Sequence, residues 1–295
     1  IIGNPDVEPE KTIQYQVGMV HKFSEKLGVE LSAFYKDVIN AEAKRIYSTM
    51  IDGQIATVTL TEMEDFAKIK GVDVKLRFNR FYNIYGDIEY NYLTAKGTGS
   101  SSREYYYLYI FDANRPLPTK EYPLEFDITH TLKANIGYYI PPAGKGLRSL
   151  LIGNWDFNVQ ANFATGRAYT PEDNYGKAME LGSKRMPATK DLDLVIRKYL
   201  GPVSFYVDIR NLFDWKNIAY VYPFSGEPDT NGKPPTFENS LYRRYIGYEN
   251  PVTGEVMRSA EEAYAAHLSL WRSLLNNPYN YSSPRIIRMG VTFRF

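Results

Sequence analysis

The sequence predicts an all-β protein, a transmembrane antiparallel β-barrel of which this chain supplies about nine strands. Three observations support this fold class. The last eleven residues, 285–295, alternate between a wholly apolar face and a face that carries arginine, and strict alternation is typical of a strand. Aromatic residues make up 15% of the 295 residues, with 26 tyrosines, which fits the aromatic girdles of a barrel. The connections between predicted strands alternate between short and long, as barrel turns and outer loops do.

Composition alone leaves a soluble alternative open. The net charge is +1, the mean hydropathy is −0.40, and no run approaches the ~20 apolar residues that a membrane helix needs. A tyrosine-rich or carbohydrate-binding β-sandwich would share this composition. Hydropathy does not exclude a barrel, however, because half of each barrel strand faces water. The near-zero charge gives no nucleic-acid footprint, and the absence of cysteine excludes disulfides and thiolate metal sites.

Nine segments are predicted to be strands because apolar and polar residues alternate along them. We expect short turns after the odd-numbered strands and long outer loops after the even-numbered ones, the first loop covering about residues 37–64. The predicted strands are 12–23, 29–36, 69–80, 86–94, 126–140, 155–164, 191–199, 202–213 and 285–295.

The strand count predicts an incomplete barrel. If the last strand ends in the periplasm, the odd-numbered strands run inward, and this agrees with the short turns that follow them. Nine strands cannot form an even-numbered closed barrel, and an open edge in lipid would leave backbone groups unpaired. The opening Ile1–Pro5 resembles a loop. We therefore expect the missing strands elsewhere, most simply upstream in the same polypeptide.

Four motifs, in order along the chain, resemble TonB-dependent outer-membrane receptors. Gly3–Gly18 resembles the family pattern N-P-x-L-x-P-E-x-S/T-x-x-Y-E-x-G, and Ala164–Pro171 resembles S/T-G-R-P-Y-T, with Ala168 in place of proline. Val207–Asp214 resembles V-x-N-L-F-D, and the final Arg-Phe pair resembles the aromatic assembly signal. The resemblance covers residues 1–295 as the C-terminal portion of the barrel.

The resemblance implies a 22-stranded barrel around a plug, so the nine strands would be the fourteenth to the twenty-second. It implies location in the cell outer membrane, with lipid, upstream strands, a plug domain and the TonB complex as partners; the plug and its TonB-contacting box are absent from this chain. Residues Pro223, Gly226 and Asp229–Gly232 resemble receptors of the Bacteroidota type. A surface lipoprotein is a further possible partner, through the predicted helix at 259–276.

The function that the resemblance implies is active uptake of a scarce nutrient: a metal chelate, vitamin, glycan or peptide. No residue of the sequence selects among these substrates. Two alternatives stay open, a structural or adhesive barrel that anchors a surface assembly and a passive porin. The sequence favours no enzyme, because its three histidines have no partners at metal-ligand spacing and it contains no G-x-S-x-G or P-loop motif.

Charged side chains of both signs share the non-lipid face of the predicted strands. Four polar side chains of one strand could not all face a dry core, so we expect this face to line the lumen. In an empty pore these residues would set ion selectivity, whereas in a plugged barrel they would contact the plug, as the resemblance favours. They are Asp73, Lys75, Arg77, Asp87, Glu89, Asp208, Arg210, Arg288 and Arg294.

One loop has the spacing of a calcium-binding loop. In Glu227–Glu238, oxygen donors occupy positions one, three, five and twelve, and glycine occupies position six, as in an EF-hand loop apart from the glutamate at position one. The candidate calcium ligands are Glu227, Asp229, Asn231 and Glu238. The alternative is an acidic, proline-rich surface loop without a metal.

Two further features lie near the end of the chain. Residues 259–276 are predicted to form a helix in the last outer loop, with Ser259 and Glu262 as a capping box. An apolar stripe on it, through Tyr264, Leu268, Trp271 and Leu275, would pack on neighbouring loops or form a lid or docking face. Phe293 and Phe295 are the candidate assembly signal.

Overall fold

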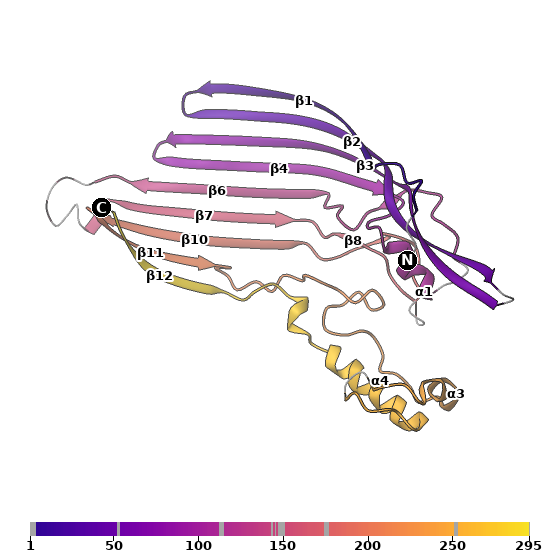
Figure 1. The fold of residues 1–295 in the computed structure, drawn as a ribbon. Helices are drawn as coiled ribbons and strands as arrows, with labels where there is room; N and C mark the ends of the chain where they lie inside the picture. The colour runs from indigo at the N-terminus through magenta and orange to yellow at the C-terminus, as the bar shows by residue number, and fades with distance from the viewer. Residues whose placement is uncertain are drawn as a thin grey trace.

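The computed structural model describes residues 4–51, 54–111, 115–142, 144, 146, 151–173, 177–250 and 253–294. Nine long antiparallel strands form one sheet in which spatial order follows chain order (Figure 1). They are β1 (Lys11–Ser24), β2 (Leu27–Ile51), β3 (Gln54–Phe81), β4 (Ile84–Gly97), β6 (His130–Ile140), β7 (Trp155–Ala164), β10 (Thr189–Leu200), β11 (Val203–Arg210) and β12 (Ile286–Phe293). The nine predicted strands are therefore confirmed in number, order and antiparallel pairing among the described residues.

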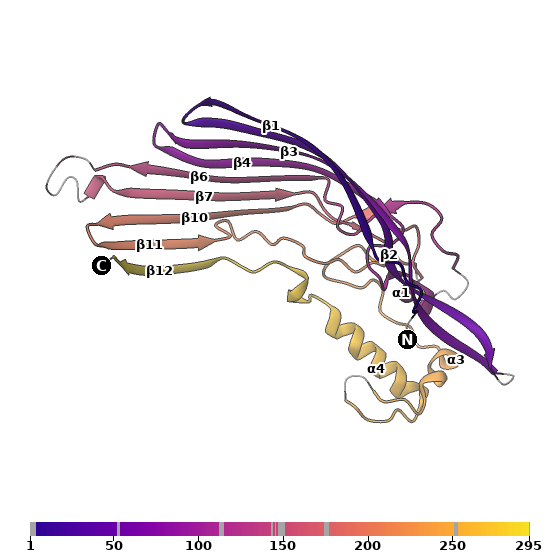
Figure 2. The ribbon, with the colours of Figure 1, turned by 45° about the horizontal axis from the view of Figure 1, so that its top comes forward.

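The sheet is curved and open. Strands β1 and β12 form its two edges, and no ladder joins them within the described part of the chain. Figure 2 shows β1 to β4 curving along their length toward the tip of the β2–β3 hairpin. Three short strands lie off this path: β5 (Tyr122–Pro123) pairs with the end of β4, while β8 (Ala168–Tyr169) and β9 (Lys184–Arg185) pair with each other. An open arc of this kind is what a partial barrel predicts.

Three short turns lie together at one end of the sheet. Two residues each separate β1 from β2, β3 from β4 and β10 from β11. In the second of these turns Tyr82 and Asn83 both have positive φ, 49° and 66°, as a type I′ hairpin turn requires. The longer segments after β4, β7 and β11 gather at the opposite end. The predicted division into short turns and outer loops holds for these three turns and these three long segments.

The predicted loop over residues 37–64 is wrong. Strands β2 and β3 instead continue as one hairpin, with a paired register that runs from Ala41 and Asp65 to Ile51 and Gln54. A register shift follows Val38, beside Asn40, whose φ is 58°. Beyond the lipid both faces of a hairpin meet water, so no alternation of apolar residues marks these strands in the sequence. The hairpin extends past the other strands in Figure 2.

The helices that support the site lie in the outer segments. They are α1 (Glu104–Phe111), α3 (Asn239–Tyr242), the 3₁₀ turns η1 (Arg243–Tyr245) and η2 (Pro278–Asn280), and α4 (Ala260–Leu274). The Ser259 Oγ accepts a hydrogen bond from the Glu262 backbone N at 3.2 Å, which confirms the predicted helix start. None of the helices in the described part combines the length and the apolar character of a membrane span.

The predicted apolar stripe on α4 is only partly the packing face. The side of α4 that is buried carries three alanines, Ala260, Ala263 and Ala266, which pack on Tyr242 and Met257. Tyr264 borders this cluster, as the stripe predicts. Small side chains face inward because the bulky ring of Tyr242 fills the space between α3 and α4.

Candidate ligand-binding site

The two faces of the sheet differ as the alternation predicts. Large apolar side chains stand exposed on one face: Tyr15, Val17, Met19, Leu31, Val72, Tyr90, Tyr92, Leu132, Tyr138, Phe163, Phe205, Ile287, Met289, Val291 and Phe293. A soluble protein rarely exposes so large a contiguous apolar surface. A lipid-facing wall explains it, since lipid covers this face in place of a protein core.

The predicted lumen residues lie together on the opposite face, and many pair across strands. Lys75 lies 3.4 Å from both Asp87 and Glu89. Arg77 contacts Glu30 on β2 at 3.1 Å. The Asp73 carboxylate accepts hydrogen bonds from the side chains of Ser32 and Asn91. This part of the wall therefore neutralises its own charges.

At the other end of the sheet, Arg210 bridges Asp193 and Asp208, each at 2.9 Å. Arg288 faces Asp208 in the register of β11 and β12, but neither Arg288 nor Arg294 forms an ion pair with any residue that the structure describes. A contact between these arginines and a plug stays a prediction.

Three aromatic rings lie flat on the lumen face, each over a glycine of the neighbouring strand. The pairs in register are Phe34 with Gly71, Tyr85 with Gly137 and Tyr206 with Gly290. A Cβ added at any of these glycines would come within 2.1–2.5 Å of the aromatic side chain. The Tyr85 hydroxyl also donates a hydrogen bond to Asp156 at 2.6 Å. Glycine in a strand often marks such a close approach.

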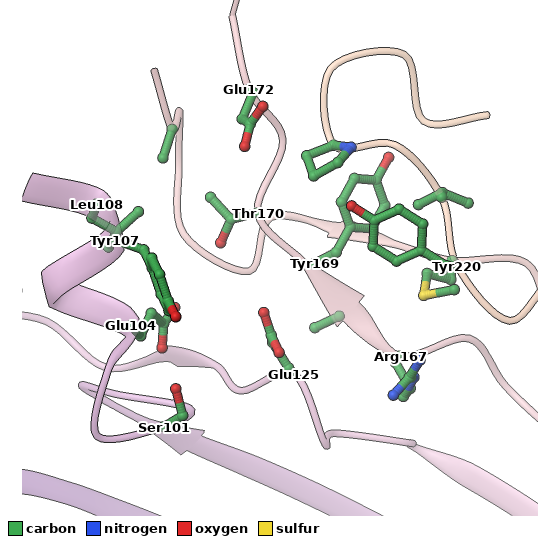
Figure 3. Close-up of a pocket in the computed structure, with 15 residues that line it drawn as sticks. Ser101, Glu104, Tyr107, Leu108, Glu125, Arg167, Tyr169, Thr170, Glu172 and Tyr220 are labelled. Atoms are coloured by element: carbon green, nitrogen blue, oxygen red, sulfur yellow. The ribbon is translucent and has the colours of Figure 1, made fainter. Parts of the chain in front are cut away.

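A pocket lies among the outer segments. It encloses about 420 Å³ and is formed by three connections: the β4–β6 segment with α1, the β7–β10 segment and the beginning of the β11–β12 segment. Figure 3 shows the side chains of Glu104, Glu125 and Glu172 around its open space. Below we call it the loop pocket, lined by these three glutamates together with Tyr107, Arg167, Tyr169, Thr170 and Tyr220.

Helix α1 is held in place by the long hairpin. The Arg45 Nη2 lies 2.7 Å from the Asp65 Oδ1, and both side chains are 6% exposed. The same carboxylate oxygen accepts a hydrogen bond from Thr98 at 3.1 Å, and the Arg45 guanidinium lies 4.9 Å from the Tyr105 ring centroid. The Lys44 backbone N also donates to the Ser102 carbonyl at 2.8 Å. The hairpin therefore fixes one wall of the loop pocket.

The other walls are joined by polar contacts between the outer segments. Arg185 donates to the Asp127 carboxylate at 2.8 Å, and this carboxylate, 2% exposed, also accepts from the Ala95 backbone N at 2.9 Å. Arg167 donates to the Ala219 carbonyl at 3.1 Å. The three outer segments thus support one another around the loop pocket. The motif at 164–171 contributes four residues to its lining.

The electrostatic environment of the loop pocket is negative. Burial first, and then the neighbouring Asp173, raises the pKa of Glu172. Burial also raises the pKa of Glu104, although its carboxylate accepts a hydrogen bond from the Ser100 backbone N at 2.5 Å. The pKa of Tyr220 is raised by burial, and the charges of Glu172 and Glu125 contribute. Both carboxylates therefore act on the same part of the loop pocket.

The predicted calcium ligands lie in a loop that has its own hydrogen bonds. The Asp229 carboxylate accepts from the Tyr281 hydroxyl at 2.6 Å, a contact that raises the pKa of Tyr281 to about 12. Glu238 accepts from Ser240 at 2.9 Å. In the part of the chain that the structure describes, no three histidine or carboxylate residues are grouped as metal ligands. Calcium at Glu227, Asp229, Asn231 and Glu238 stays a prediction.

The two residues of the candidate assembly signal have different outcomes. Phe293 is the last residue of β12 and is 62% exposed on the lipid face, whereas Phe295 lies outside the described residues. The loop pocket was not predicted from the sequence. Its only sequence signal was indirect, because the motif at 164–171 resembles a receptor motif whose position in space the sequence does not give.

An open amphipathic sheet with turns at one end and long segments at the other defines an outer-membrane β-barrel. The family model described as "TonB dependent receptor-like, beta-barrel" matches residues 1–212. The chain therefore belongs to the TonB-dependent receptor family, whose members are outer-membrane receptors and transporters, not enzymes. A search of curated protein sequences finds no match.

Solved structures share this fold. The outer-membrane transporter YddB from Escherichia coli has a TM-score of 0.53 and 11% identity, over 74% of this chain and 30% of that one. The pyoverdine receptor FpvA from Pseudomonas aeruginosa PAO1 has a TM-score of 0.54 and 12% identity, over 98% of this chain and 30% of that one. This chain thus spans about three-tenths of their length. None of these comparisons confirms the Bacteroidota type, which stays a prediction.

Proposed function

We propose that this chain forms the ligand-capturing part of a receptor that takes up a scarce nutrient actively across the outer membrane. The observation that carries the proposal is a built pocket at the outer end of a lipid-facing wall. A passive pore needs a polar channel but no pocket at its mouth, whereas a receptor for a dilute nutrient needs a concave site with a few convergent polar groups. Metal chelates, vitamins, glycans and peptides are the candidate nutrients.

The proposal includes partners that complete the receptor. Strands β1 and β12 present free edges, and unpaired backbone groups in lipid are costly enough that further strands must cover them. A plug domain would lie against the polar face of the sheet, where aromatic rings lie over Gly71, Gly137 and Gly290. On the same face Arg288 and Arg294 form no ion pair with any residue that the structure describes. TonB would supply energy through that plug.

The helical part of the last outer segment is the proposed docking face or lid. Residues Tyr242, Met257, Ala260, Ala263 and Ala266 form a core of their own, so this part keeps its shape without support from the sheet. It lies away from the sheet in Figures 1 and 2. A surface lipoprotein is the partner proposed for it.

The test is uptake by cells that carry the complete receptor. Accumulation of the nutrient should fall to background when either the receptor or TonB is deleted, and restoring each gene should restore it. Uptake that persists without TonB would support a passive porin instead. A receptor deletion that alters cell-surface assembly but not uptake would support the structural alternative.

A further inference from the structure

The loop pocket has the chemistry of a site for positive charge. Resting on the proposed function, we propose that it binds a small organic ligand through a protonated amine or guanidinium group, with Glu172 as the principal counter-charge. The aromatic rings around Glu172 would contact the remainder of the ligand. Three features of the loop pocket support this substrate class: its excess of carboxylates, the partial burial of Glu172 and its tyrosine rings.

The lining of the loop pocket carries more acidic than basic side chains. Three glutamates line it together with one arginine, Arg167. Glu104 is the first residue of α1, Glu125 lies between β5 and β6, and Glu172 belongs to the β7–β10 segment. Among the described residues, none of these glutamates forms an ion pair with a lysine or arginine. The guanidinium of Arg167 donates to the Ala219 carbonyl. The chain therefore leaves negative charge in the loop pocket that a ligand can neutralise.

Glu172 is the carboxylate of the loop pocket that lacks a partner among the described residues. Its side chain is half-buried, and among the described residues its carboxylate has neither a hydrogen-bond donor nor a cationic partner. Removing an ionised carboxylate from water without a partner is unfavourable. Fold stability alone would favour glutamine at this position. A carboxylate at this position is explained if a cationic group of a bound ligand neutralises its charge.

Tyrosine rings border the loop pocket. Tyr107 and Tyr220 are both exposed to the open space, and Figure 3 shows their rings on opposite sides of it, with Glu125 between them. The face of an aromatic ring attracts a cation within about 6 Å of its centre. A volume of about 420 Å³ suits a small molecule or one residue of a peptide. Anionic ligands would be repelled by the glutamates, and neutral saccharides would leave their charge unbalanced.

The experiment uses the complete receptor in detergent and two probes that differ in one group. N-acetyl-argininamide carries a guanidinium, and N-acetyl-citrullinamide replaces it with a neutral urea of nearly the same shape. Calorimetry at neutral pH should show at least roughly tenfold tighter binding of the arginine probe, the ratio that one charged hydrogen-bonded contact provides. Glu172→Gln should remove this preference. Glu180→Gln, at an exposed carboxylate of the same segment that does not line the pocket, should leave it unchanged.

The outcomes separate the two proposals. Equal binding of both probes, no binding of either in the millimolar range, or tighter binding of maltose than of the arginine probe would overturn the cationic ligand class. None of these results bears on whether uptake requires TonB. Conversely, a charge preference that depends on Glu172 would stand even if uptake proved independent of TonB, and then only the proposed function would be wrong.

Discussion

The wall of the barrel and the loop pocket use charge in opposite ways. On the wall, Lys75 and Arg210 each contact two carboxylates of the same chain. In the loop pocket, Glu172 has no such partner among the described residues. Evolution of a stable fold accounts for paired charges but not for a half-buried unpaired one. The difference indicates that the wall neutralises its charges within the chain, whereas the charge of the loop pocket is neutralised by a bound ligand.

The same comparison separates what could and could not be predicted. Lipid on one side and water on the other impose a two-residue period on every spanning strand, so the nine strands could be predicted from alternation. The period disappears beyond Val38, where β2 leaves the lipid, and the rest of the β2–β3 hairpin was therefore predicted as a loop. Only local hydrogen-bonding signals, such as Ser259 before α4, were reliable in the outer segments.

The largest expected effect tests whether the hairpin supports the loop pocket. Arg45→Ala leaves the buried Asp65 carboxylate without its cation, which should lower the stability of the outer segments by about 3–5 kcal/mol. Hydrogen exchange should then accelerate through α1, and ligand binding should weaken. Arg77→Ala is the matched control, because it removes a wall ion pair whose arginine is 59% exposed and should cost at most about 1 kcal/mol. Equal effects of the two substitutions would contradict the structural contrast.

The second prediction tests the two faces of the wall. Val159→Lys places a charge on the lipid face of β7 and should lower folding stability in lipid vesicles by about 2–4 kcal/mol near the middle of the bilayer. Gln160→Lys, one residue later, places the same charge on the lumen face and should be nearly neutral. Urea titrations of folding followed by gel mobility would measure both. A larger loss for Gln160→Lys would reverse the assignment of the faces.

The third prediction tests the flat rings on the lumen face. In Gly137→Ala the new Cβ would meet the Tyr85 ring at 2.1 Å, and moving the ring would also strain its hydrogen bond to Asp156. Overpacking of this kind costs about 1–3 kcal/mol. Gly28→Ala is a matched strand substitution with a nearest contact of 3.6 Å, so its effect should be small. If the first loss disappears in the double variant with Tyr85→Ala, the ring contact is its cause.

The smallest effect is a pH dependence that has opposite signs for stability and for binding. Because burial raises the pKa of Glu172, its ionised form is unfavourable in the folded state, and this disadvantage disappears as the pH falls through the raised folded pKa. Glu172→Gln should therefore stabilise the ligand-free β7–β10 segment at neutral pH, with a difference that shrinks on acidification.

Binding of the arginine probe should change the other way, since it needs the ionised carboxylate. Wild-type affinity should begin to fall at a higher pH than an ordinary glutamate would allow, and the Gln variant should lose this dependence. The neighbouring groups, Asp173 and Tyr220 beside Glu172 and Glu125 beside Tyr220, are unchanged in the variant and serve as the internal reference. Hydrogen exchange and calorimetry on the same two proteins would measure both signs. If the Gln variant neither stabilises the segment nor loses the pH dependence of binding, Glu172 is an ordinary surface carboxylate and the contrast between wall and pocket fails at its central residue.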